Sequence, residues 1–131
     1  MTAPGGGGVG AAVGAVVGWD IGGVNIKVAR VVGGAMGGLS QVREHPFELQ
    51  RAPETLASIL RGLAAACGVA SEDRHAVTMT AELSQMFRTK REGVAFVLDA
   101  VHEAFPAADI AVFTVDGRFL STAEARRDPL R

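Results

Sequence analysis

Apolar residues in the first third of the chain recur in short runs separated by glycines. One run starts at residue 15 and reaches an acid at Asp20, a pair of glycines follows, and a second run covers residues 24–32. A third, mixed run at 39–45 ends at Pro46, which suits an edge strand. The pattern predicts three strands joined by tight glycine-rich turns, and therefore an antiparallel meander.

The apolar period changes to that of a helix beyond this meander. Pro53 suits the first turn of a helix, and Gly68 suits its C-terminal cap. Thr89 and Glu92 form a capping box that predicts a second helix, which Pro106 ends. The apolar stripes consist of Leu56, Ile59, Leu60, Leu63 and Cys67 in the first helix and of Val94, Val97, Leu98, Val101 and Phe105 in the second.

Two further apolar runs, at residues 76–80 and 109–115, predict strands that alternate with these helices. Residues 81–87 fit a short helix or a loop equally well. The resulting order is that of the ribonuclease-H-like fold, the building block of actin-like ATPases and sugar kinases. We therefore expect an α/β lobe whose mixed sheet has three antiparallel strands followed by helix, strand, helix and strand.

The sequence divides into three segments. Residues 1–14 are mostly Gly and Ala, a composition typical of a disordered leader. Residues 15–120 hold the predicted strands and the two helices and form the lobe. Ser121 and Glu124 make another capping box, so the tail at 121–131 reads as the start of a truncated helix.

Composition and charge narrow the class of protein. A chain of 131 residues suits one domain, and its formal net charge of -1 favours neither nucleic acid nor an acidic membrane as partner. The single Cys67 excludes an internal disulfide framework, and the spacing of Cys and His suggests no zinc site. The apolar run at 9–19 is too short to cross a bilayer, which needs about 20 residues. We expect a soluble, cytoplasmic protein without a membrane or nucleic-acid partner.

The first predicted turn carries candidate chemistry. Gly22 and Gly23 can adopt positive φ and let backbone N–H groups approach an anion, while Asp20 beside them can hold Mg²⁺ or its water. Asn25 and Lys27 share the strand face that is turned toward this acid. The alternative for the D-x-G-G pattern alone is a structural turn without a ligand.

Four stretches of the sequence resemble a known family. They read G-W-D-I-G-G-V-N-I-K, A-V-T-M-T-A-E-L, R-T-K-R-E-G-V and T-V-D-G-R-F-L, and they occur in order between residues 16 and 120. These stretches resemble the hydantoinase A/oxoprolinase-related family. Within it, they are similar to the branch of tetrahydromethanopterin-linked one-carbon transfer pathway proteins that serves methanofuran biosynthesis.

This resemblance implies an actin-like fold with a phosphate or diphosphate site at the first turn. It also points to Thr80, Glu82 and Asp116 as further site residues, with Asp20 and Glu82 in catalytic roles. Each has a structural alternative, since Glu82 suits a helix start and Asp116 suits a plain turn.

The sequence departs from the family in three places. Val24 stands where kinase-like relatives have Ser or Thr, so a hydroxyl contact to phosphate is lost. A P-L-W type segment is missing around residues 46–50. Family members are about twice as long or longer, so the chain corresponds to an N-terminal lobe that a second lobe or partner chain would complete.

Three functions compete on this basis. The first is a transferase lobe that binds a diphosphate-bearing aminomethylfuran substrate with Mg²⁺ near Asp20, stabilises the departing diphosphate, and uses Glu82 as base toward an amine nucleophile. The second is a non-catalytic lobe whose exposed apolar surface binds a partner chain. The third is half of an ATP-dependent hydantoinase or oxoprolinase, for which ATP would be the cofactor.

Overall fold

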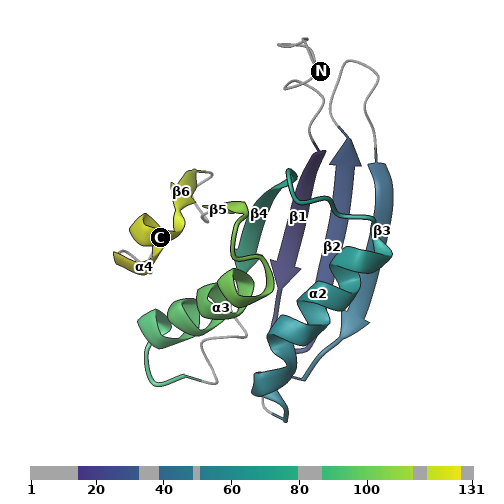
Figure 1. The fold of residues 1–131 in the computed structure, drawn as a ribbon. Coiled ribbons are helices and arrows are strands. Elements are labelled where there is room, and N and C mark those ends of the chain that lie inside the picture. The colour runs from purple at the N-terminus through teal and green to yellow at the C-terminus, as the bar shows by residue number, and fades with distance from the viewer. Residues whose placement is uncertain (1–14, 33–38, 49–50, 80–86, 114–117, 128–131) are drawn as a thin grey trace.

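The computed structural model describes residues 15–32, 39–48, 51–79, 87–113 and 118–127. Figure 1 shows the arrangement of its elements. The strands are β1 (Ala15–Ile21), β2 (Asn25–Val32), β3 (Leu39–Pro46), β4 (Arg74–Met79), β5 (Asp109–Phe113) and β6 (Phe119–Ser121). The helices are the 3₁₀ turn η1 (Pro53–Thr55), α2 (Leu56–Ala66), α3 (Lys90–Ala104) and α4 (Thr122–Arg127).

The strands form one mixed sheet in the order β3-β2-β1-β4-β5-β6. Strand β1 pairs antiparallel with β2, which pairs antiparallel with β3, whereas β1–β4 and β4–β5 are parallel. This is the predicted ribonuclease-H-like arrangement, with β3 at one edge. Strand β6 extends the sheet antiparallel to β5 at the other edge and was not predicted, because three residues carry too little alternation to read.

Both long helices cover the same face of the sheet (Figure 1). Each lies in a crossover connection between parallel strands, and connections of this kind share one hand. Strand β1 sends Val17, Trp19 and Ile21 toward these helices, where they are buried. The apolar stripe of α2 includes Leu60 and that of α3 includes Val97, and both residues are fully buried in the same core. Successive strand residues alternate between faces, so the sheet has one face beneath the helices and one open face.

A polar network lies inside the helix-covered layer. The Trp19 indole Nε1–H donates to Nδ1 of the buried His75 at 2.9 Å, and Phe105 packs against the imidazole with ring centroids 4.4 Å apart. Burial lowers the pKa of His75, while the nearby Asp73 carboxylate acts in the opposite sense. Asp73, itself buried, accepts a hydrogen bond from Arg30 Nε at 2.8 Å, so this layer contains a paired charge as well as a neutral imidazole.

The helix ends follow the predicted signals. Gly68 has φ 70°, its N–H donates to Ala65 O, and the N–H of Val69 donates to Ala64 O, which closes α2 as a Schellman motif. At the start of α3, the Thr89 side chain and the Glu92 backbone and side chain form the expected capping box.

Two predicted boundaries were wrong, and several predictions lie outside the described residues. Strand β2 begins at Asn25, so Val24 belongs to the turn and is 58% exposed. Strand β4 begins at Arg74, two residues before the predicted start, because pairing with β1 extends it through polar residues. Residues 1–14, the segment 80–86 with Thr80 and Glu82, and the 114–117 turn with Asp116 are not described.

No helix among the described residues is long and apolar enough to cross a membrane.

Candidate functional site

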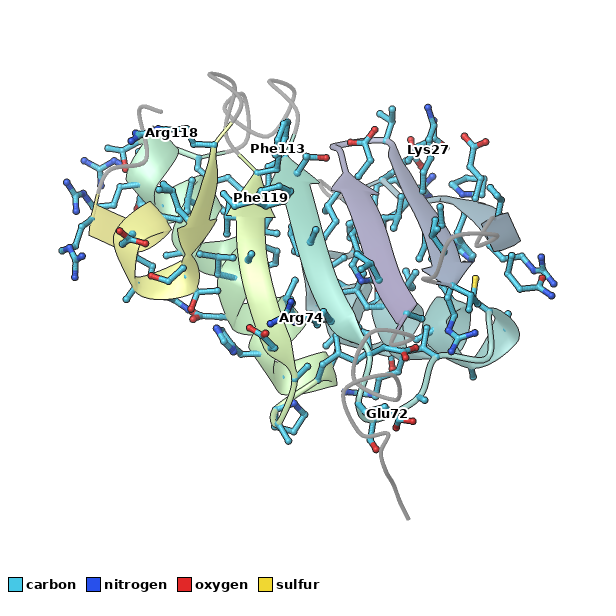
Figure 2. All side chains as sticks on the ribbon, turned by 90° about the horizontal axis from the view of Figure 1, so that it is seen from above. Lys27, Glu72, Arg74, Phe113, Arg118 and Phe119 are labelled. Carbon is cyan, nitrogen blue, oxygen red and sulfur yellow. The ribbon has the colours of Figure 1, made fainter. Side chains whose placement is uncertain are left out.

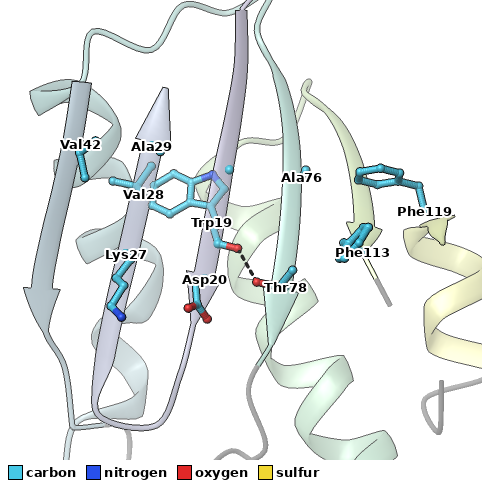
Figure 3. Close-up of a pocket in the computed structure, with 11 residues that line it drawn as sticks. Trp19, Asp20, Lys27, Val28, Ala29, Val42, Ala76, Thr78, Phe113 and Phe119 are labelled. Atoms are coloured by element: carbon cyan, nitrogen blue, oxygen red, sulfur yellow. Dashed lines mark hydrogen bonds between the residues drawn. The ribbon is translucent and has the colours of Figure 1, made fainter. Parts of the chain in front are cut away.

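The open face of the sheet carries a hollow of about 390 Å³ near the carboxyl end of β1 (Figure 3). Asp20 on β1 pairs with Lys27 on β2 and with Thr78 on the parallel strand β4, so the three residues share one face. In open α/β sheets, ligands bind at the carboxyl ends of the strands. The lining residues are Gly18, Trp19, Asp20, Lys27, Val28, Ala29, Val42, Ala76, Thr78, Phe113 and Phe119.

Asp20 has an unsatisfied acceptor. Its Oδ1 is buried, and it has no hydrogen-bond partner among the described residues. A buried polar atom without a partner is unfavourable, because it has lost water without gaining a protein bond. The Oδ1 atom is therefore free to receive a cation, an N–H or a hydroxyl group.

Lys27 supplies the positive charge of the hollow. Its side chain is exposed, and no ion pair joins it to Asp20 or to the facing Glu44 in the part of the chain that is described. A lysine ammonium without a protein counter-ion is a point charge that suits a phosphate oxygen. Asp20 and Lys27 thus come together as the sequence predicted.

Thr78 is a lining residue that sequence reasoning missed. Its Oγ1–H donates to the backbone oxygen of Trp19 at 3.1 Å, which ties β4 to β1 beside Asp20 (Figure 3). The donor is used internally, whereas the hydroxyl lone pairs remain able to accept. Only the parallel register between β1 and β4 reveals this residue, and that register cannot be read from one strand.

The glycine turn differs from the expected anion cradle. The N–H of Gly22 donates to Asn25 O at 2.9 Å, so this group closes the turn and is not available to a ligand. Within the described ranges, positive φ occurs at Gly68 alone, and so neither Gly22 nor Gly23 adopts the left-handed conformation. Asn25 stands opposite Pro46 on β3 and lies outside the set of lining residues. The role predicted for the Gly23 amide stays a prediction.

The donor set suits a weakly coordinated magnesium ion. The described residues contain no group of three or more His, Cys, Asp or Glu side chains that could hold a metal. Mg²⁺ at phosphate sites commonly takes one or two carboxylates and fills its other positions with water and substrate oxygens. The unpaired Oδ1 of Asp20 fits such a single-carboxylate site.

Comparison with known proteins gives one curated relative. It is the (4-{4-[2-(gamma-L-glutamylamino)ethyl]phenoxymethyl}furan-2-yl)methanamine synthase of Methanocaldococcus jannaschii, which is 31% identical over 115 residues. The match covers 88% of this chain and 32% of the relative, so the chain spans about a third of the length of that synthase. No protein-family profile matches the sequence, and membership of the hydantoinase A family stays a prediction.

Comparison with solved structures gives a likeness in fold. The T. thermophilus RuvC in complex with a Holliday junction substrate superposes with a TM-score of 0.51 at 17% identity, covering 76% of this chain and 64% of RuvC. The Aquifex aeolicus PPX-GPPA enzyme gives a TM-score of 0.48 at 10% identity, covering 76% of this chain and 36% of that enzyme. At such identities the RuvC likeness concerns the fold alone, and together with the strand order it confirms the ribonuclease-H-like fold.

Proposed function

We propose that this chain is the phosphate-binding lobe of a synthase in methanofuran biosynthesis, and that it holds the diphosphate of an aminomethylfuran substrate at Asp20 and Lys27. The observation that carries the proposal is the buried, unpartnered Oδ1 of Asp20 in the same hollow as the exposed Lys27. The name of the 31% identical Methanocaldococcus synthase supports the furan methanamine part of the substrate, and the diphosphate is what the family resemblance implies.

The name of that relative corrects the expected nucleophile. Its product is a phenoxymethylfuran with a free methanamine, so the bond between the two halves is an aryl ether. We infer that a phenol oxygen attacks the furan methylene, rather than an amine. The new carbon–oxygen bond forms as the bond from the methylene to the diphosphate breaks, the electron pair leaves with the diphosphate, and the phenol proton passes to a base. Glu82 remains the candidate base.

We assign a part in this step to each of four residues. Lys27 neutralises charge on the departing diphosphate, and the N–H of Gly23 is the proposed donor to one of its oxygens. Asp20 would hold Mg²⁺, and the ion would supply positive charge to stabilise the leaving group. Thr78 ties β4 to β1 through its hydrogen bond to the Trp19 backbone oxygen, next to Asp20.

Inorganic pyrophosphate is the probe that tests the site. Wild-type chain is expected to bind it in a Mg²⁺-dependent manner in isothermal titration calorimetry. Asp20→Asn and Lys27→Met should each weaken binding by about 10- to 100-fold, since a hydrogen bond to a charged group contributes about 1.5–3 kcal/mol. Glu44→Gln, which removes the neighbouring carboxylate on β3, is the matched control and should bind like wild type.

Two results would overturn the proposal. The first is unchanged Mg²⁺-dependent binding in Asp20→Asn, which would make the turn structural. The second is tight ATP binding in place of pyrophosphate, which would favour the hydantoinase- or oxoprolinase-type function. A partner-binding function is the second candidate, and the apolar open face of the sheet favours it.

A further inference from the structure

One row of side chains crosses the open face of the sheet near the carboxyl end of β1. Lys27 on β2 is the register partner of Asp20 on β1, and Asp20 is the partner of Thr78 on β4. Register partners point to the same face, so an ammonium, a carboxylate and a hydroxyl stand next to one another (Figure 3). This is the polar end of the hollow, at which we place the diphosphate.

The same row becomes aromatic on the next two strands. Val77 on β4 and Val112 on β5 are partners, so Phe113, one residue further along β5, continues the row. Phe119 on β6 is the partner of Phe113, and their ring centroids are 4.9 Å apart (Figure 2). Both rings line the same hollow as the polar residues. The hollow therefore has a charged end and an aromatic end.

The two phenylalanines point away from the core. The exposed fractions of Phe119 and Phe113 are 63% and 39%, whereas their neighbours Leu120 and Val112 are buried on the helix-covered side. The planes of the two rings are inclined by 59°. The pair thus forms a corner that a third flat ring can enter, stacked on one phenylalanine and edge-on to the other.

Small residues leave room in front of this corner. Gly18 on β1 and Ala76 on β4 are register partners, and both line the hollow. Ala76 is in turn the partner of Ala111 on β5. Glycine within a strand often marks a place that a ligand approaches closely. The floor between the charged end and the aromatic end is therefore low enough for a flat ring.

The spacing of the two ends suits one small molecule. Asp20 and Phe113 lie two strands apart, and a strand spacing of about 4.8 Å puts roughly 10 Å between their backbones. A furan ring that is joined to a diphosphate through one methylene bridges such a distance. The phenol ring of the acceptor lies further from the diphosphate, because its oxygen attacks the methylene from the side opposite the leaving group.

We propose that Phe113 and Phe119 hold the furan ring of the diphosphate donor and make the site selective for ring-bearing over simple alkyl diphosphates. This inference rests on the proposed function, because it takes the diphosphate to be bound at Asp20 and Lys27. It adds two specificity-determining residues from β5 and β6 to a site that the sequence placed at the first turn.

Two diphosphates that differ in their ring test this subsite. Ethyl diphosphate has no ring, whereas 2-(furan-2-yl)ethyl diphosphate carries the furan, and its additional methylene keeps the ligand from losing its diphosphate during the titration. Isothermal titration calorimetry of the full chain in Mg²⁺ buffer gives both affinities. Wild type is expected to bind the furan ligand about tenfold more tightly, since a ring in the corner gains buried area and ring contacts.

Phe119→Ala should lower this affinity ratio by about three- to tenfold and should keep the melting temperature, because the ring is largely exposed. Phe113→Ala should lower the ratio as well. Val31→Ala is the matched control. Val31 is 40% exposed and, as the partner of Val16, lies on the same face, but it does not line the hollow, so its removal should leave the ratio unchanged.

Inorganic pyrophosphate separates the two ways in which the test can fail. Both phenylalanine variants should bind it like wild type. Equal affinities for the two organic diphosphates, in a chain that binds pyrophosphate, would overturn the subsite and leave the site at Asp20 and Lys27 intact. If neither pyrophosphate nor either organic diphosphate binds, the proposed function fails and the subsite fails with it.

Two further results would overturn the subsite alone. The first is a lower melting temperature in Phe119→Ala than in Val31→Ala, which would show that the pair of rings packs the fold. The second is an unchanged affinity ratio in Phe119→Ala together with lost binding of p-cresol at saturating pyrophosphate. The phenol acceptor would then be the occupant of the aromatic end.

Discussion

The hydrogen bond between Trp19 and His75 determines which ring nitrogen of the neutral imidazole carries the proton. Since Nδ1 of His75 accepts the indole N–H, the neutral imidazole must carry its proton on Nε2. A second proton could enter only by displacing Trp19 from a site packed against Phe105. The lowered pKa of His75 agrees with this geometry, because burial disfavours the charged ring.

The first prediction concerns pH. The folded-state pKa of His75 lies below its ordinary value of 6.5, so the unfolded chain binds more protons at mildly acidic pH. The contribution of His75 to the free energy of unfolding is fully present above about pH 6.5. It falls as the pH drops from there toward the folded-state pKa. Urea unfolding at pH 7.5 and pH 5.5 measures the loss. His75→Phe should flatten this dependence, whereas His45→Asn, at an exposed position, should keep it.

The second prediction concerns the charge paired with Asp73. Burial by itself raises the pKa of Asp73, but hydrogen bonds from Arg30 and from the Ala70 N–H outweigh it and hold the pKa below 3.8. Arg30→Met leaves the buried carboxylate with the Ala70 bond alone and should destabilise the fold by about 1–3 kcal/mol.

Arg74→Met is the control for Arg30→Met. It breaks an ion pair with Asp109 whose two side chains are 74% and 68% exposed, and such surface pairs contribute about 0–1 kcal/mol. Urea unfolding at pH 7 measures the free energy of unfolding of both variants. An equal decrease in the two would show that the buried pair stabilises the fold no more than the exposed pair does.

At the scale of the element, the C-terminus of α2 yields a third prediction. Gly68 has φ 70°, where a Cβ is strained by about 1–2 kcal/mol, so Gly68→Ala should destabilise by that amount. Gly62→Ala is the matched control within the same helix, because an added Cβ meets nothing within 4 Å. It should stabilise by about 0.5–1 kcal/mol, since alanine favours helix over glycine. Thermal melts that move both variants in the same direction would contradict the capping geometry.

Capping residues and apolar periodicity predicted most helices and strands. The features that they missed depend on the pairing of strands that are far apart in the sequence. The Thr89–Glu92 box and the Gly68 cap lie within a few residues of the ends that they set, so the sequence displays them directly. Thr78 lies beside Asp20 because β1 and β4, nearly sixty residues apart in sequence, are paired in the sheet. No single stretch of the sequence shows that pairing.

The glycine turn was misjudged for a related reason. Glycine permits positive φ but does not require it, and here the Gly22–Asn25 hydrogen bond closes the turn without it. Gly23→Val is therefore expected to disturb a bound anion more than the fold. A large drop in melting temperature would contradict this reading.

At the scale of the whole molecule, all described helices lie on one side of the sheet. Helix α4 packs through Ala125 against Leu98 of α3 and Val112 of β5, and so it adds to the covered side. The opposite side keeps its apolar residues in contact with solvent, and this asymmetry has a measurable effect.

The fourth prediction is that the open face of the sheet binds the dye ANS, which reports exposed apolar surface. Phe119→Ser should lower the fluorescence without lowering the melting temperature, because Phe119 is 63% exposed and contributes little to the core. Val24→Ser is the matched control, since Val24 is 58% exposed but lies in the β1–β2 turn and does not line the hollow. Equal dye binding by wild type and Phe119→Ser would mean that the surface is not continuous.

The central position of β1 has a consequence for how the chain is made. One edge of β1 pairs with β2, its neighbour in sequence, but the other edge pairs with β4, which ends at Met79. During synthesis, the meander can close early, yet the inner edge of β1 stays unpaired until β4 leaves the ribosome. An unpaired apolar edge invites pairing with another nascent chain. Stalling translation just before residue 74 should therefore yield aggregation-prone nascent chains, whereas stalling well beyond residue 79 should yield protected ones.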